Sequence, residues 1–131
     1  MKLLHSMFEI SGDNVGGKAV SLSDETASHA DFTLCFNPDH PIYQAHFPGK
    51  PITPGVCIVK VLGELLELKL GRRLELKEIK NLKFVSPISP IANARVDVRF
   101  RKIDVNEHVK VQGTITRGET VYTKFSLIFH E

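Results

Sequence analysis

A histidine and two Pro-Gly pairs stand close together in the segment HFPGKPITPG, which covers residues 46–55. Imidazole titrates near neutral pH, so His46 can take up a proton under physiological conditions. The prolines restrict the conformations of the unfolded loop, which lowers the entropic cost of holding the histidine in place. Because a general base needs such a rigid position, the segment predicts that His46 acts as a base in catalysis.

An apolar stretch follows this loop and predicts one long helix. Residues 55–70 are apolar over most of the helix circumference, and the pattern stops at Gly71, as is typical of a C-terminal glycine. A helix that is apolar nearly all round is a buried helix. Its polar exceptions recur at helical spacing and form one narrow stripe, which we expect to face water, a pocket or a partner chain. The stripe consists of Lys60, Glu64, Glu67 and Gly71.

The loop and the start of the helix resemble the active-site motif of the hot-dog-fold (3R)-hydroxyacyl-acyl-carrier-protein dehydratases of fatty acid synthesis. That motif is written HFPGxPxxPG, with a carboxylic acid five residues later. In this chain Lys60 holds the place of the acid. A lysine ammonium keeps its proton near pH 7 and is therefore a poor general acid. The residues that match the loop of the motif are His46, Phe47, Pro48, Gly49, Pro51, Pro54 and Gly55.

Dehydration of a 3-hydroxyacyl thioester requires a base, an acid, and donors that stabilise an enolate-like oxygen. The resemblance assigns the base to His46 and the oxyanion contact to Gly55, with Val56 beside it. These two residues begin the helix, so their N–H groups are unpaired donors at the positive end of its dipole. Glycine at position 55 also lets a substrate approach the backbone closely.

The missing acid leaves three alternatives, because loss of a positioned acid typically costs ~10²–10⁴ in rate. In the first, Glu64 acts as the acid from one turn further along the helix, where relatives usually carry glutamine. In the second, Lys60 and Glu64 form an ion pair and the pocket binds substrate without eliminating water. The third follows from the family's dimers, in which the histidine of one chain faces the acid of the other. An acid-bearing paralogue would then complete the site of His46 in a heterodimer.

The resemblance also implies the partners and the substrate class. Family members receive the substrate on the phosphopantetheine arm of an acyl carrier protein, form homodimers or higher oligomers, and use no cofactor. This implies thioester chemistry in fatty acid or polyketide-like lipid synthesis. A catalytically weak acyl-thioester-binding subunit is the second interpretation, and an acyl thioesterase that uses Glu64 is the third. The basic residues Arg95, Arg99 and Arg101 are interpreted as a solvated face or as part of a basic rim for an acidic carrier protein.

The rest of the chain predicts a sheet. Residues 29–36 alternate between apolar and polar side chains, and four further stretches with strand character follow the helix without another helix between them. This order argues for an antiparallel sheet wrapped around the long helix, an α+β domain over residues 1–131, in agreement with the hot-dog fold that the resemblance implies. The four stretches are residues 74–85, 93–103, 107–117 and 120–129; weaker strands are predicted at 2–10 and 15–22, and a helical turn at 41–45.

Composition excludes several classes of protein. Seventeen Lys and Arg against fifteen Asp and Glu give a net charge of +2, which is too balanced to predict nucleic-acid binding. The two cysteines have no metal-binding or disulfide spacing and indicate a reducing cytoplasm. No signal peptide and no membrane-spanning stretch is predicted. Asp39 and His40 lie near His46 without a third ligand at suitable spacing, so no metal site is predicted.

Overall fold

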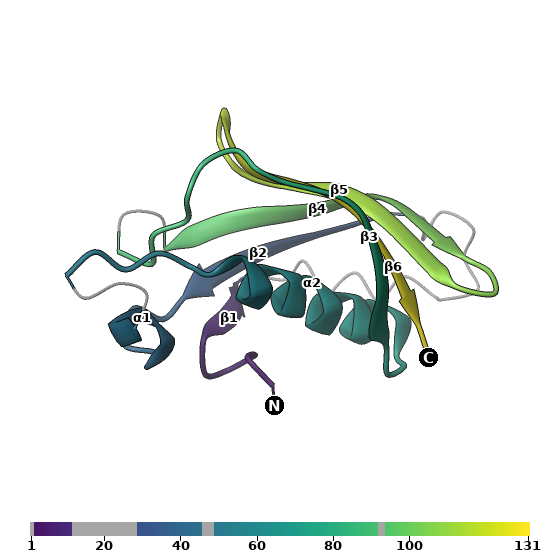
Figure 1. Cartoon of the computed structure of the whole chain (residues 1–131), viewed down its shortest axis with the longest axis horizontal. Helices are drawn as coiled ribbons and strands as arrows, with labels where there is room; N and C mark the ends of the chain where they lie inside the picture. The colour runs from purple at the N-terminus through teal and green to yellow at the C-terminus, as the bar shows by residue number, and fades with distance from the viewer. Residues whose placement is uncertain (1, 12–28, 46–48, 92–93) are drawn as a thin grey trace.

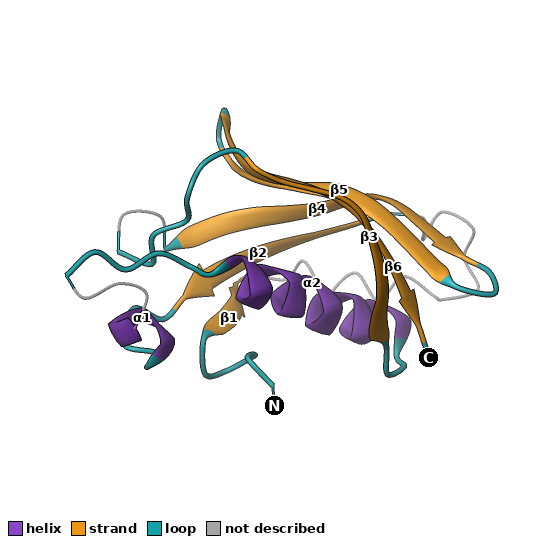
Figure 2. Cartoon of the chain, in the orientation of Figure 1, coloured by secondary structure: helices purple, strands orange, loops and turns teal. Residues whose placement is uncertain are grey.

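The computed structural model describes residues 2–11, 29–45, 49–91 and 94–131. In this part of the chain six strands form one antiparallel sheet in the order β1-β2-β4-β5-β6-β3. The sheet curls over one long helix, α2 (Figures 1 and 2), as predicted from the order of the elements. The elements are β1 (Phe8–Ser11), β2 (Ala30–Phe36), α1 (Ile42–Ala45), α2 (Gly55–Leu70), β3 (Glu75–Phe84), β4 (Arg95–Val105), β5 (Val109–Arg117) and β6 (Thr120–His130).

Helix α2 begins and ends where the sequence predicts. Pro54 precedes it in an extended conformation, which fits a residue that cannot donate a backbone hydrogen bond. Gly71 ends it in the left-handed region with φ 69°, and the Gly71 N–H bonds the carbonyl of Glu67 at 2.8 Å. The helix is not covered all round, however, because Val56 is 78% exposed and Leu68 is 41% exposed. Both apolar side chains are therefore open to another molecule.

Strand β4 follows the predicted alternation from Arg95 to Phe100. In β4, Val96, Val98 and Phe100 are buried on the face toward α2, and Arg95 and Arg99 point to the exposed outer face. This period of two is what a sheet with one buried face requires. The helical turn at α1 and the strand β2 are also confirmed. The weak strand predicted at 15–22 lies outside the described residues.

The N-terminal prediction is wrong in its first half. We expected a strand over residues 2–10, but β1 starts only at Phe8. Before it the chain turns: the Met7 N–H bonds the carbonyl of Leu3 at 2.7 Å, and His5 has φ 73°. In this turn Leu3 and Met7 are both buried in the core. The chain therefore enters the core as a turn before β1 begins.

None of the helices in the described residues is both long enough and apolar enough to cross a membrane.

Candidate active site

A buried hydrogen bond joins Tyr43, which precedes the motif loop, to Thr53 near the end of that loop. The hydroxyl groups of Tyr43 in α1 and Thr53 before α2 lie 2.9 Å apart, and the two residues are 3% and 4% exposed. The Thr53 N–H also bonds the carbonyl of Ile88 at 2.8 Å. The predicted site residues His46, Phe47 and Pro48 lie between these anchors and outside the described residues. Gly49 follows them with φ 75°, a conformation that favours glycine.

Tyr43 and Thr53 were not identified as site residues from the sequence. A tyrosine and a threonine ten residues apart carry no periodic signal, and only the fold shows that they meet. Burial raises the pKa of Tyr43 to about 12, although its hydrogen bond to Thr53 acts in the opposite direction. Burial also raises the pKa of the nearby Cys57 thiol. The cluster is therefore uncharged near neutral pH and anchors the loop without adding charge beside it.

The pH dependence of stability tests the buried state of Tyr43. A folded-state pKa of about 12 lies above the ordinary value of 10, so the contribution of Tyr43 to stability is complete below pH 10 and is lost between about pH 10 and 12. The difference between the wild-type chain and Tyr43→Phe should change across this interval by roughly 2–3 kcal/mol, from ~1.4 kcal/mol per pH unit. Urea unfolding at a series of pH values measures it.

Thr123→Val is the matched control for Tyr43→Phe. Thr123 is fully buried, and its hydroxyl has no hydrogen-bond partner in the described structure. Its replacement removes a buried hydroxyl that contributes no bond, so its effect should not vary between pH 10 and 12. If the Tyr43→Phe difference is equally flat, Tyr43 is not buried as the structure places it.

The N-terminus of α2 is shaped by a glycine and an aromatic ring. A Cβ at Gly55 would lie 2.7 Å from Cζ of Phe84, so only glycine fits beneath this ring as it stands. The Cys57 and Ile58 N–H groups bond the carbonyl of Pro54 at 3.0 and 3.1 Å. The N–H groups of Gly55 and Val56 have no acceptor among the described residues, as is general at the start of a helix, and their role as oxyanion donors stays a prediction.

Lys60 and Glu64, one turn apart on α2, have different surroundings. Lys60 is exposed, whereas Glu64 is 2% exposed. The carboxylate of Glu64 accepts the Leu3 N–H at 2.7 Å and the Leu4 N–H at 2.9 Å, one on each oxygen. These two described side chains form no ion pair with each other, so the structure does not show the alternative in which Lys60 pairs with Glu64. The backbone of the N-terminal turn meets the carboxylate instead, which favours a structural role for Glu64 over the role of acid.

The anchoring of the N-terminal turn by Glu64 predicts a large loss of stability on its removal. Glu64→Ala leaves the buried N–H of Leu3 without an acceptor and removes two hydrogen bonds to a charged group. The free energy of unfolding should fall by roughly 2–4 kcal/mol, and by less for Glu64→Gln, which keeps one acceptor oxygen. Urea unfolding compares both with Glu119→Ala, an exposed control. Equal stability of Glu64→Ala and Glu119→Ala would contradict the assignment.

Three residues of the polar stripe of α2, Lys60, Glu67 and Gly71, line an open basic groove, whereas Glu64 does not. The groove has a volume of about 340 Å³, and four of its lining residues are basic while one is acidic. The acidic one, Glu67, accepts the Leu74 N–H at 2.8 Å and is thereby held against the end of the helix. The groove therefore presents mostly positive charge beside Lys60. Its lining residues are Lys2, Lys60, Glu67, Leu68, Gly71, Arg72 and Arg73.

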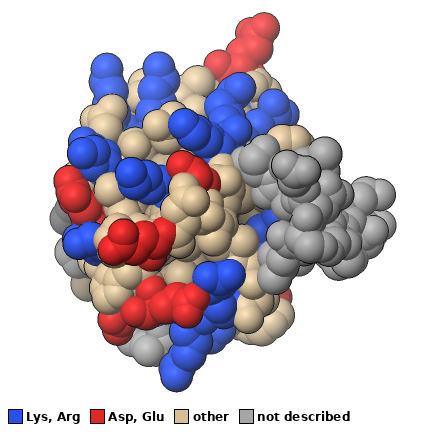
Figure 3. Space-filling view, turned by 90° about the vertical axis from the view of Figure 1, so that its right-hand side faces the viewer, with Lys and Arg blue, Asp and Glu red and all other residues tan. Residues whose placement is uncertain are grey.

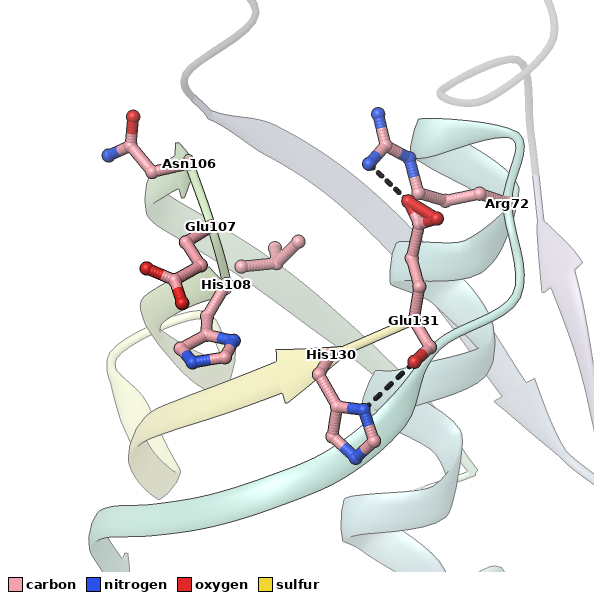
Figure 4. Close-up of a pocket in the computed structure, with 7 residues that line it drawn as sticks. Arg72, Asn106, Glu107, His108, His130 and Glu131 are labelled. Atoms are coloured by element: carbon pink, nitrogen blue, oxygen red, sulfur yellow. Dashed lines mark hydrogen bonds and ion pairs between the residues drawn. The ribbon is translucent and has the colours of Figure 1, made fainter.

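A second groove of about 450 Å³ lies beyond the C-terminal end of α2 (Figure 4). Arg72 and Glu131 form an ion pair of 2.7 Å in it, and His130 bonds the carbonyl of Glu131. It is at the opposite end of the helix from the motif loop and is therefore not part of the candidate site. No cluster in the described residues could hold a metal ion. The other lining residues are Asn106, Glu107, His108 and Val109.

The end of the molecule seen in Figure 3 carries both signs of charge. Lys and Arg side chains gather over its upper part, while Asp and Glu side chains lie mainly in its lower half. A mixed surface of this kind is the ordinary solvated exterior of a globular protein and not the single-sign face of a nucleic-acid-binding protein.

The chain matches the ApeI-like family, described as ApeI dehydratase, over residues 22–123. It is 32% identical over 92 residues to the 3-hydroxyacyl-[acyl-carrier-protein] dehydratase FabZ of Caulobacter sp. (strain K31), a match that covers 70% of this chain and 52% of that one. FabZ of Roseiflexus sp. (strain RS-1) is 37% identical over 70 residues, a match that covers 48% of this chain and 49% of that one. The chain thus spans about half the length of these curated relatives.

Solved structures share the architecture. The dehydratase heterocomplex ApeI:P from Xenorhabdus doucetiae superimposes with a TM-score of 0.62 at 15% identity, over 83% of this chain and 93% of that one. An (R)-hydratase from A. caviae superimposes with a TM-score of 0.50 at 12% identity, over 99% of this chain and 98% of that one. These structures confirm the predicted hot-dog fold. Because the family match covers well over half of its residues, the chain belongs to the ApeI-like dehydratase family.

Proposed function

We propose that the chain acts on 3-hydroxyacyl thioesters carried by an acyl carrier protein, as a dehydratase-like protein in fatty acid or polyketide-like lipid synthesis. The observation that carries the proposal is the HFPGKPITPG motif at the start of helix α2, whose first N–H groups are free of acceptors in the described structure. The curated relatives from Caulobacter and Roseiflexus are 3-hydroxyacyl-acyl-carrier-protein dehydratases, which supports this substrate class.

In the proposed reaction His46 removes the proton next to the thioester carbonyl. The N–H groups of Gly55 and Val56 bind the carbonyl oxygen as negative charge develops on it. An acid then protonates the hydroxyl at the third carbon, and water leaves to give the enoyl thioester. The basic groove beside Lys60 is complementary to an acidic carrier protein, which supports delivery of the substrate on its phosphopantetheine arm.

The acid has to come from a second chain. Lys60 holds the place of the acid on α2, and the carboxylate of Glu64 is buried against the N-terminal turn. A relative from Xenorhabdus doucetiae is a dehydratase heterocomplex, which supports pairing with an acid-bearing paralogue. A pair of identical chains would instead have Lys60 in both sites. It would bind acyl thioesters and eliminate water slowly, which is the second candidate function.

An assay on the purified chain tests the chemistry. The chain is mixed with a 3-hydroxyacyl thioester of an acyl carrier protein, the enoyl product is followed by its ultraviolet absorbance, and released thiol is titrated in parallel. For the chain on its own we expect slow formation of enoyl product without thiol release, at a rate that Glu64→Gln leaves unchanged. Thiol release would mean hydrolysis and would make the chain a thioesterase. If Glu64→Gln no longer eliminates water while the wild-type chain does, Glu64 is the general acid.

A further inference from the structure

The start of helix α2 is held by the residue two positions before it. Thr53 is 4% exposed and makes two hydrogen bonds to parts of the chain that lie on either side of it in the fold. Its N–H donates to the carbonyl of Ile88 at 2.8 Å, and its hydroxyl lies 2.9 Å from the hydroxyl of Tyr43. These two partners are themselves buried, at 1% and 3%. Thr53 is therefore held between α1 and the segment that follows β3.

Only Pro54 separates Thr53 from the first N–H groups of the helix. The Pro54 carbonyl accepts the N–H groups of the third and fourth helical residues at 3.0 and 3.1 Å, so its direction sets the axis of the first turn. The proline ring fixes the φ angle, which leaves Pro54 little freedom to absorb a movement of Thr53. A shift of Thr53 is therefore passed on to the N–H groups of Gly55 and Val56.

The hydroxyl groups of Tyr43 and Thr53 form a pair that stays uncharged while a histidine titrates. Burial raises the pKa of Tyr43 to about 12, so the phenol keeps its proton at every pH at which His46 could act as a base. Because both residues are almost wholly buried, neither is placed to exchange a proton with a substrate. A role for this pair in catalysis must therefore be one of positioning.

We propose that Tyr43 and Thr53 are positioning residues, whose buried hydrogen bond keeps the N–H groups at the start of α2 aimed at the thioester oxygen. This inference rests on the proposed function, in which the N–H groups of Gly55 and Val56 bind that oxygen. Donors of this kind stabilise developing charge because they are aimed in advance and do not reorganise during the reaction. A displacement of ~1 Å can cost ~10²-fold in rate. The hydroxyl pair should thus act on the rate of the reaction more than on the affinity for the substrate.

The carbonyl stretch of a bound thioester reports on the donors directly and needs neither the acid nor the base. The probe is butanoyl pantetheine, isotopically labelled at the thioester carbonyl, which has no hydroxyl to eliminate. Difference infrared spectra are taken with the full chain, and hydrogen bonds from Gly55 and Val56 should shift the stretch of the bound probe to lower wavenumber. Tyr43→Phe and Thr53→Val should each lose most of that shift. Thr53→Ser keeps a hydroxyl and should keep the shift.

The pattern of infrared shifts separates this inference from the proposed function. A carbonyl that shifts equally in the wild-type chain and in all three variants would overturn the positioning role and leave oxyanion binding at Gly55 in place. A carbonyl that is unshifted in the bound wild-type chain would overturn oxyanion binding itself, and the inference with it. Thr114→Val is the matched control, because the Thr114 hydroxyl on β5 is buried without a hydrogen-bond partner in the described structure. This control should keep the full shift.

Rates give an independent test in the Lys60→Glu chain, in which a carboxyl group stands at the place of the acid. Tyr43→Phe and Thr53→Val should each lower kcat by roughly 10- to 100-fold and leave KM nearly unchanged, by the same factor at every pH below 10. The double variant should be no slower than either single one, because both substitutions remove the same hydrogen bond. Additive losses, a change in KM alone, or an altered pH profile would refute the proposal.

Discussion

The Lys60→Glu chain is expected to dehydrate a 3-hydroxyacyl thioester ~10²–10⁴-fold faster than the wild-type chain on its own, the range that a positioned general acid contributes. Lys60 is exposed on α2 at the place where the family motif has its acid, and in a self-paired dimer both sites would carry it. A carboxyl group there can protonate the departing hydroxyl, which an ammonium does poorly near pH 7. The initial rate of enoyl formation measures the gain.

Two control variants show whether a gain in rate comes from the carboxyl group added at position 60 or only from the loss of the positive charge of Lys60. Lys60→Gln removes the charge without adding an acid and should give no comparable gain. Lys110→Glu makes the same charge change on an exposed residue of β5 and should also leave the rate unchanged. An ordinary dehydratase rate in the wild-type chain alone would contradict the expectation, because Lys60 would then be no obstacle.

Replacing His46 with asparagine in the Lys60→Glu chain is expected to abolish that gain, with a loss of ~10²–10⁴ in rate. Asparagine is similar in size and polarity but cannot take the proton from the carbon next to the carbonyl. The acid supplied at position 60 would then have no base to act with, so the two substitutions should be strongly non-additive. The rates of the wild-type chain, the two single variants and the double variant give the coupling energy between positions 46 and 60.

His29→Asn is the control for the loss of a histidine, since His29 is exposed just before β2. Its rate in the Lys60→Glu background should be unchanged. Urea unfolding of the His46→Asn chain should give the same free energy of unfolding as its parent chain, so that the loss of rate is not caused by a loss of folding. A His46→Asn chain that keeps its rate would place the base at another residue and remove the central role of the loop.

The elements that the sequence predicted well are those set by local pattern. Helix α2 has a largely apolar circumference and a glycine stop, and β4 alternates from Arg95 to Phe100, so propensity and periodicity agree with the fold. The features that escaped prediction depend on contacts between distant residues. Glu64 bonds the N–H groups of Leu3 and Leu4 some sixty positions away, and no spacing along the chain encodes that. The same contacts explain why the predicted N-terminal strand is a turn.

The candidate site also combines features that local sequence predicts with features that depend on distant contacts. The motif loop could be recognised because its residue types are contiguous, and the helix N-terminus at Gly55 followed from it. The bond between Tyr43 and Thr53 could not be predicted, since it requires α1 to fold back against the start of α2. The exposure of Val56 was also unexpected, because an apolar pattern alone does not distinguish a surface covered by the same chain from one left open for a neighbour.

The ring of Phe84 links the edge of the sheet to the candidate site. It ends the edge strand β3 and lies against Gly55, the first residue of α2. A molecule bound at the N–H groups of Gly55 and a strand added at β3 would therefore act on the same ring. If binding at Gly55 changes the affinity of the β3 edge for another strand, thermodynamic linkage requires that a strand bound at the edge change the affinity at Gly55 by the same factor.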